Sequence, residues 1–365
     1  MVCASFAVER PTVLTLLPPE IFVARPALWL RAISRYRGTV SAAPNFAYGL
    51  CTRKISDEEL EGVDLSSWRV ALNGAETVSP QVMRAFRRRF AAWGLRREAL
   101  SPVYGLAEAA LAVTFPVLEE PFRALRFERA SLTPGEEPRL AEDGFELASL
   151  GRPLPGFSIS VRDRLGAAQD PARVGRIWVR GPSLMAGYLD RDGATADVVR
   201  DGWLDTGDLG FLRQDELYVV GRAKDMLIVR GRNIAPETAE WALDEVVGVR
   251  RGCTVAVGQA VPGGETERVL LFVERERGAG REDSTELEGR CVRAVLAAIG
   301  VQADKVIILP PGALPRTSSG KIRRREALRR FEVGELTPPG RVNAVTLARA
   351  LARSALAHRR ARMGE

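Results

Sequence analysis

Four short segments combine glycines with side chains that could do chemistry. They are residues 104–108 (YGLAE), 202–210 (GWLDTGDLG), 221–231 (GRAKDMLIVRG) and 314–321 (LPRTSSGK). Their carboxylates can accept hydrogen bonds or hold a hard cation, and their basic groups can stabilise negative charge. Taken singly, each segment reads as a strand end, a solvated loop or a surface cation. Their occurrence together, in this order, points to one functional site.

The single histidine excludes several classes of enzyme. His358 lies near the end of the 365 residues, so a Ser-His-Asp hydrolase, a Cys-His protease or a histidine-rich metal site lacks its essential residue in the folded body. The four cysteines, Cys3, Cys51, Cys253 and Cys291, show no C-x-x-C spacing. We expect them to be small buried side chains in a reducing compartment.

The net charge of +7 is concentrated in one part of the chain. Residues 321–365 hold 12 Arg or Lys and 4 Glu, whereas the first 320 residues are close to neutral. The basicity is therefore a property of a tail, and no nucleic-acid partner is expected. Because no apolar run is long enough to span a membrane, we expect a cytoplasmic protein without a transmembrane segment.

The elements that position the four segments alternate between strand and helix in the first half of the chain. Short apolar strands are predicted at residues 13–17, 39–43, 70–72 and 102–104. The clearest helix begins after Ser79 with Pro80 in its first turn and stops at Gly94. This alternation predicts a parallel α/β sheet, and glycine-bearing turns at residues 73–76 and 104–108 follow two of its strands. In such sheets, ligands bind at the carboxyl ends of the strands.

The second half of the chain has a different pattern. Residues 151–222 show short strands and turns, and from residue 223 the chain restarts as a compact α+β unit. We predict an α/β subdomain at 1–150, a β-rich subdomain at 151–222, an α+β domain at 223–335 and a basic helical tail at 336–365.

The four segments together resemble the adenylate-forming superfamily of acyl-CoA synthetases, peptide-synthetase adenylation domains and luciferases. Residues 43–48, 72–76, 104–109 and 151–156 look most like its fatty acyl-AMP ligase branch. The resemblance covers roughly residues 10–335. It implies a partial adenylate-forming fold, with a parallel α/β subdomain, a small β-rich subdomain and a mobile C-terminal α+β lid domain. Residues 115–151 fall where that branch carries an insertion that limits the use of coenzyme A.

The resemblance also implies roles for individual residues. The residues that match ATP- or AMP-contacting positions are Gly74, Ala75, Glu76, Tyr104, Gly105, Leu106, Ala107, Asp208 and Arg222. Among these, Asp208 matches the carboxylate that accepts hydrogen bonds from both ribose hydroxyls, and Arg222 assists it. Glu108 matches the glutamate associated with Mg²⁺. Lys224 falls at the hinge of the small domain, and Lys321 matches the catalytic lysine that bridges the acyl carboxylate and the α-phosphate.

In this resemblance, ATP and Mg²⁺ are the cofactors and a fatty acid is the substrate. The acyl-adenylate is then attacked by the phosphopantetheine thiol of an acyl carrier protein, commonly in polyketide or lipopeptide assembly. A fatty acyl-CoA ligase, with coenzyme A as acceptor, remains an alternative. So does a non-catalytic remnant that binds nucleotide or carrier.

Some family features have no counterpart in the sequence. These are the Thr/Ser/Gly-rich phosphate loop that ends in Pro-Lys, the first α/β subdomain and the phosphate-side histidine. We therefore expect a truncated or split chain, with a separately encoded N-terminal portion as a partner. Alone, it would hold AMP weakly and fail to position the β- and γ-phosphates of ATP.

Overall fold

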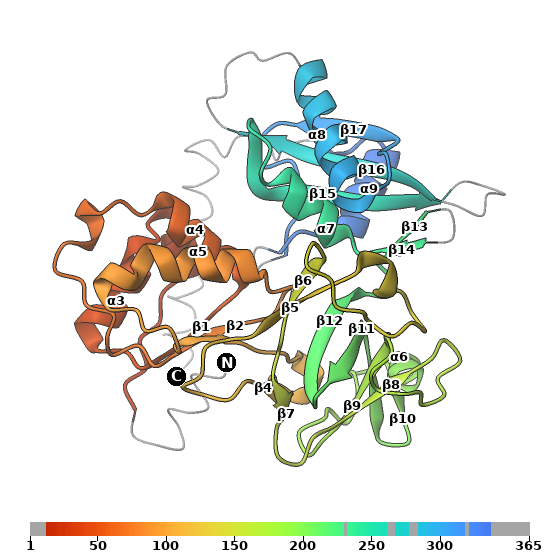
Figure 1. The fold of residues 1–365 in the computed structure, drawn as a ribbon, viewed down its shortest axis with the longest axis horizontal. Coiled ribbons are helices and arrows are strands. Elements are labelled where there is room, and N and C mark those ends of the chain that lie inside the picture. Colours follow the sequence, from red (N-terminus) through yellow and green to blue (C-terminus); the bar gives the residue numbers. More distant parts are fainter. Residues whose placement is uncertain (1–11, 230–231, 261–266, 277–283, 318–320, 337–365) are drawn as a thin grey trace, which may run out of the picture. The chain divides into compact units, whose positions relative to one another are not determined.

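The computed structural model describes residues 12–229, 232–260, 267–276, 284–317 and 321–336 (Figure 1). By its backbone contacts the chain divides into two compact units, residues 1–237 and 238–365, and each is described by itself. Cys3, His358 and the tail from residue 337 onward lie outside the described residues, as do residues 230–231 and 318–320 of the predicted motifs.

A three-stranded parallel sheet forms the first part of unit 1. Its order is β1 (Val40–Ala43), β2 (Val70–Asn73) and β3 (Leu100–Pro102). The helices α4 (Asn45–Lys54) and α5 (Pro80–Phe90) pack against each other beside this sheet (Figure 1). The predicted start of α5 is confirmed, because Ser79 Oγ accepts a hydrogen bond from Val82 N. Further helical turns are α2 (Pro19–Ala24), α3 (Ala27–Tyr36), η1 (Glu58–Leu60) and η2 (Ala91–Trp93).

Aromatic side chains fill the core around this sheet. Trp29 makes edge contacts with Tyr48 and Trp68, and Phe86 contacts all three rings. Each of these side chains is buried. Burial of each large aromatic removes roughly 150–250 Å² from water, so this cluster fixes the helices on the sheet.

An antiparallel sheet follows in the same unit. Its strands run in the order β10-β11-β9-β8, and β12 also pairs with β11. The bounds are β8 (Ser158–Arg162), β9 (Gly175–Arg180), β10 (Val199–Arg200), β11 (Trp203–Arg213) and β12 (Glu216–Arg222), with α6 (Asp192–Val198) between β9 and β10.

Residues 115–151 are a folded connection and contain a strand pair. Strand β5 (Ala124–Phe127) pairs antiparallel with β6 (Phe145–Ala148), and η4 (Arg129–Ser131) lies between them. The short strands β4 (Thr114–Phe115) and β7 (Arg152–Pro153) pair with each other and bring the two ends of this connection together. Arg84 on α5 donates to both carboxylate oxygens of Glu146 on β6, at 2.7 and 2.5 Å. The strand pair is therefore fastened to the parallel α/β part of the unit.

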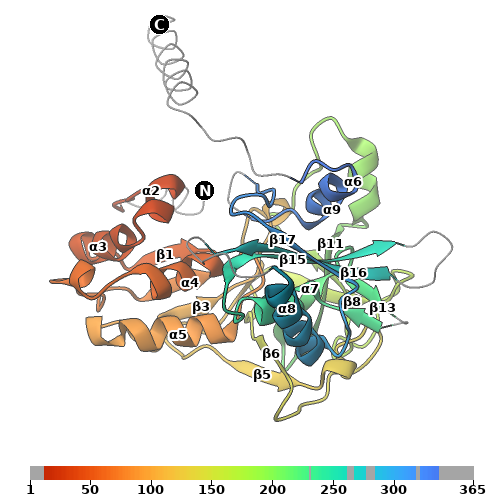
Figure 2. The same cartoon turned by 90° about the horizontal axis from the view of Figure 1, so that it is seen from above.

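Unit 2 is an α+β fold built on the sheet β15-β16-β17. Its strands are β15 (Val249–Ala260), β16 (Glu267–Arg275) and β17 (Lys305–Leu309). The helix α8 (Ser284–Ile299) packs against β17 and α9 (Arg324–Glu332) against β15, on opposite faces of the sheet (Figure 2). Residues 269–274 of β16 are all buried, as expected for a strand covered on both faces. The pair β13 (Leu227–Val229) and β14 (Arg232–Ile234) and then α7 (Pro236–Leu243) connect the two units in sequence.

Several local predictions differ from the structure. Residues 13–17 form no strand, and the strand predicted at 102–104 ends at Pro102. Residues 205–208 belong to the long strand β11. The predicted burial of the cysteines is confirmed for Cys51, Cys253 and Cys291, which form no disulfide. None of the helices in the described ranges is long and apolar enough to cross a membrane.

Candidate functional site

The turn after β2 packs directly against the end of β3. A Cβ atom added to Gly74 would lie 2.8 Å from the carbonyl oxygen of Val103. Ala75 has a φ of +68°, and Glu76 Oε1 accepts a hydrogen bond of 2.7 Å from Phe46 N in the first turn of α4. Residues 74–76 are thereby fixed at the carboxyl end of the parallel sheet.

The turn after β3 is tighter still. A Cβ atom on Gly105 would fall 1.5 Å from the carbonyl oxygen of Leu111, so only glycine fits. Leu106 and Ala107 lead into the 3-10 turn η3 (Ala107–Ala109), which carries Glu108. Leu111 N donates back to Leu106 O at 3.0 Å and closes the turn.

Tyr104, Asp208 and Arg222 come together although they are far apart in the sequence. The Tyr104 hydroxyl donates to Asp208 Oδ2 at 2.7 Å, and Arg222 Nε donates to Asp208 Oδ1 at 3.2 Å. Asp208 and Arg222 are directly paired between β11 and β12. Each carboxylate oxygen has one protein donor and keeps further acceptor capacity for a ligand.

Backbone irregularity in β11 aims Asp208 at this cluster. The pairing of β11 with β9 shifts between Asp205 and Leu209, and Gly207 in this stretch has a φ of +79°. Thr206 Oγ1 accepts from Asp208 N at 3.1 Å, and Arg176 holds Asp205 through contacts of 3.2 and 2.5 Å. Such a bulge re-aims a side chain out of a regular ladder.

Burial controls the ionisation of this cluster. It raises the pKa of Asp208, and the neighbouring Tyr104 hydroxyl and Arg222 only partly oppose that shift. Burial, followed by the negative charge of Asp208, also raises the pKa of Tyr104 well above its usual value. Tyr104 therefore stays protonated at neutral pH and serves as a donor.

Glu108 is held by a residue that sequence reasoning did not identify. Tyr188 lies beyond β9, and its hydroxyl donates to Glu108 Oε1 at 2.8 Å. Met185 N donates to the backbone oxygen of Glu108 at 2.7 Å. Partial burial, followed by the hydrogen bond to Glu108, raises the pKa of Tyr188. The sequence signal that could have pointed to Tyr188 was its place after Gly187, in the loop that follows the strand at residues 175–180.

The two lysines of interest occupy different units. Lys224 is exposed in the turn between β12 and β13 of unit 1, where Ala223 N donates to Gly207 O at 3.0 Å. Lys321 lies in unit 2 just before α9, and its backbone N donates to Thr317 Oγ1 at 3.1 Å. Ile322, the residue after Lys321, forms an isolated antiparallel bridge with Arg316.

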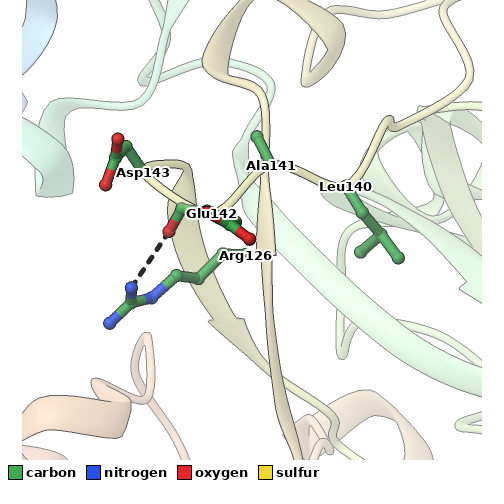
Figure 3. Close-up of a pocket in the computed structure, with 5 residues that line it drawn as sticks. All are labelled: Arg126, Leu140, Ala141, Glu142 and Asp143. Carbon is green, nitrogen blue, oxygen red and sulfur yellow. Dashed lines mark hydrogen bonds between the residues drawn. The ribbon is translucent and has the colours of Figure 1, made fainter.

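A surface hollow of about 670 Å³ lies between β5 and the loop that leads into β6, and none of the residues named above lines it. Arg126, Leu140, Ala141, Glu142 and Asp143 line it (Figure 3). Arg126 Nη1 donates to Glu142 O at 3.0 Å and braces the loop. Within the described ranges, no group of three or more His, Cys, Asp or Glu side chains is placed to hold a metal ion.

Comparison with known proteins places this geometry in a family. Residues 10–189 match the AMP-binding enzyme family. The chain is 34% identical over 350 residues to the long-chain-fatty-acid–AMP ligase FadD26 of Mycobacterium bovis, covering 90% of this chain and 59% of that protein. It is 35% identical over 339 residues to the medium-chain-fatty-acid–[acyl-carrier-protein] ligase JamA of Moorena producens, covering 88% and 56%.

Solved structures agree with this comparison. One from a study of fatty acyl-adenylate ligases from E. coli and L. pneumophila has a TM-score of 0.79 at 36% identity, over 86% of this chain and 57% of that chain. The adenylation and carrier domains of McyG, complexed with phenylalanyl-adenylate, give a TM-score of 0.73 at 27% identity, over 87% and 54%.

The fold is that of part of an adenylate-forming enzyme, so the predicted fold class is confirmed. The chain belongs to the AMP-binding enzymes of the adenylate-forming superfamily and is fatty acyl-AMP ligase-like. It spans 59% and 56% of the length of the two curated relatives named above.

Proposed function

We propose that this chain supplies the adenosine-binding and lid portions of a ligase that activates a fatty acid as its acyl-adenylate. The acyl group is then transferred to the phosphopantetheine thiol of an acyl carrier protein. Support comes from the cluster of Tyr104, Asp208 and Arg222 beside the carboxyl end of the parallel sheet, and from the relatives' activities on fatty acids. ATP and Mg²⁺ are the cofactors in this proposal.

The residues present fit the adenosine part of the nucleotide. Only 14% of the Asp208 side chain is exposed, so a ligand can reach its carboxylate from few directions. Its two oxygens are preset by one donor each, and both can accept from the neighbouring hydroxyls of a ribose. The turns at Gly74 and Gly105 follow the carboxyl ends of β2 and β3, and in this proposal they would form the walls of the adenine pocket.

The residues also fit a magnesium–nucleotide complex. Mg²⁺ is usually bound by one or two carboxylates together with substrate phosphates, rather than by an all-protein cage. Glu108 offers one such carboxylate, and Tyr188 orients one of its oxygens. When bound, Mg²⁺ would neutralise phosphate charge; Glu108 holds the complex at the turn.

Lys321 supplies positive charge for the first half-reaction in this proposal. A lysine ammonium is a compact point charge on a flexible stem, suited to charge that develops on the α-phosphate and the attacking carboxylate. Unit 2 carries Lys321, and rotation about Lys224 would remove it before thioester formation.

Two assays test the proposal. Isothermal titration of the chain with AMP and with a non-hydrolysable fatty acyl-adenylate should show tighter binding of the acyl-adenylate. Preparations that contain this chain and exchange pyrophosphate in the presence of fatty acids should then be offered holo acyl carrier protein or coenzyme A. Transfer to the carrier supports the proposed acceptor, whereas transfer to coenzyme A alone identifies an acyl-CoA ligase. If the chain binds neither AMP nor the acyl-adenylate, the proposal is contradicted.

A further inference from the structure

The loop of residues 181–188, between β9 and α6, holds Glu108 by its backbone and by its side chain. Met185 N donates to Glu108 O at 2.7 Å, and Ser183 Oγ donates to Ala109 O at 2.9 Å. The hydroxyl of Tyr188 reaches the carboxylate itself, at 2.8 Å from Oε1. These three contacts join positions about 80 residues apart in the chain.

The turn that carries Glu108 needs such support. The two residues that follow η3, Ala110 and Leu111, have φ angles of +52° and +110°. Non-glycine residues in this region are strained by of order 1–3 kcal/mol each, and they persist only where the surroundings fix them. The loop 181–188 provides fixed partners on the side where Glu108 projects.

Tyr188 is itself anchored. Its backbone N donates to Thr195 Oγ1 at 2.9 Å, and Thr195 Oγ1 donates to Arg191 O at 3.1 Å, so the tyrosine is tied to α6. A Cβ atom on the preceding Gly187 would lie 3.0 Å from the Thr195 side chain, which shows how closely the loop passes α6.

A tyrosine hydroxyl is a chemically suitable partner for a metal-binding carboxylate. It fixes the direction of one carboxylate oxygen without cancelling the negative charge that attracts a cation, as an arginine or lysine would. The second oxygen, Glu108 Oε2, receives no donor from the described residues and remains available.

We propose that Tyr188 is a positioning residue that orients the Glu108 carboxylate toward the magnesium–nucleotide complex, acting through its hydroxyl. This inference rests on the proposed function, because that function is what gives Glu108 a cation to hold. It assigns a role to the loop 181–188 in preparing the turn that carries Glu108.

The test measures ATP affinity of the full chain by isothermal titration, in Mg²⁺ and separately in EDTA. Wild type should bind ATP more tightly in Mg²⁺. Tyr188→Phe should lose about tenfold of that gain, the size expected for a hydrogen bond to a charged group. Its affinity in EDTA should change by less than about twofold, as for a substitution remote from the ligand.

Two further variants separate positioning from general destabilisation. Tyr218→Phe is the matched control, because the hydroxyl of Tyr218 bonds to Ser149 and makes no contact with Glu108. This variant should keep the full gain in ATP affinity from Mg²⁺. In a Glu108→Gln background, Tyr188→Phe should have no further effect, because its partner carboxylate is already gone.

Equal weakening in Mg²⁺ and in EDTA would show a merely structural role and overturn the inference. So would an undiminished Mg²⁺ gain in Tyr188→Phe, or additive losses in the double variant. If wild type binds AMP but gains no ATP affinity from Mg²⁺, the role of Tyr188 fails while the proposed function stands. If wild type binds neither AMP nor ATP, the proposed function itself fails, and the role of Tyr188 fails with it.

Discussion

The Tyr104 hydroxyl donates a 2.7 Å hydrogen bond to Asp208 Oδ2 and joins two sheets of unit 1 across 104 residues of sequence. Tyr104 follows the last parallel strand, and Asp208 lies on the antiparallel strand β11. This bond sets one oxygen of Asp208, and Arg222 sets the other. The carboxylate is therefore oriented before any ligand arrives, which lowers the cost of binding one.

Tyr104→Phe should weaken AMP binding by about fivefold to tenfold, because the freed Asp208 oxygen loses one donor and its fixed orientation. The aromatic ring and its burial are kept, so the free energy of unfolding should fall by about 1 kcal/mol, the contribution of one hydrogen bond. The thermal midpoint should therefore fall by only a few degrees. Isothermal titration and thermal denaturation would measure the two effects. Unchanged AMP affinity would argue against a role for this bond.

Adenosine binding should weaken on acidification at a higher pH than an exposed aspartate would produce. Burial raises the pKa of Asp208, so its carboxyl takes up a proton while the pH is still above the ordinary aspartate value of about 3.9. The protonated group carries no charge and has fewer acceptor sites for ribose hydroxyls. Adenosine is the appropriate ligand because it lacks a titrating phosphate. The Asp208→Asn variant should bind adenosine weakly, with little dependence on pH. If the adenosine affinity of this variant and of wild type changed equally with pH, the effect would belong to another group.

Gly105→Ala should disrupt the turn that carries Glu108. The new methyl group would meet the backbone oxygen of Leu111, which a side-chain movement cannot relieve. We expect destabilisation of about 3 kcal/mol or more and loss of nucleotide binding. Gly193→Ala in α6 is the matched control, since nothing lies within 4 Å of its added methyl. Denaturant unfolding should leave this control at or above wild-type stability.

Arg250→Ala should destabilise unit 2 by about 3 kcal/mol, since it leaves a buried carboxylate without its cation. Glu274 is fully buried; Arg250 Nη1 donates to its Oε2 at 2.6 Å, and Leu314 N donates to its Oε1 at 2.9 Å. Glu274 thus anchors the start of the 314–321 segment. Urea unfolding would measure the loss, and a change below about 0.5 kcal/mol would contradict the expected coupling.

Lys321→Ala separates the two proposed half-reactions. In preparations containing this chain that form acyl-adenylate, the substitution should reduce pyrophosphate exchange by at least about a hundredfold, because a charge used in the transition state is lost. Thioester formation from supplied acyl-adenylate should continue near the wild-type rate. Equal loss of both steps would contradict the assigned role, and Lys305→Ala is a control for general loss of a lysine.

Much of the fold could be predicted from local signals. Ser79 and Pro80 mark the start of α5 because capping and the fixed proline φ act within one turn. The strand predicted at residues 13–17 was wrong, since an apolar run becomes a strand only with a pairing partner. Tyr104 likewise leaves β3 and bridges to Thr114. The local sequence does not tell whether residues 13–17 find a partner strand, or that Tyr104 pairs with Thr114.

The candidate site was only partly predictable for the same reason. Glycine-bearing turns after strands pointed to residues 74–76 and 104–108, because a glycine that follows a strand is a local sign of a turn. The contact with Val103 that leaves room only for glycine at position 74 is not local and appeared only in the structure. The bond between Tyr188 and Glu108 depends on how β9 and α6 direct the loop between them, and so it emerged only with the tertiary structure. The roles assigned to Asp208, Lys224 and Lys321 from the family resemblance stay predictions until they are tested.

Direct titration of the chain with a non-hydrolysable fatty acyl-adenylate tests the central claim most directly. We predict saturable binding at one site, weakened at least about tenfold by Asp208→Asn, since that substitution alters an acceptor buried against Tyr104. Asp201→Asn, at an exposed position just before β11, should bind like wild type. Absence of binding, or equal affinity in the Asp208 and Asp201 variants, would contradict the claim that this chain holds an acyl-adenylate.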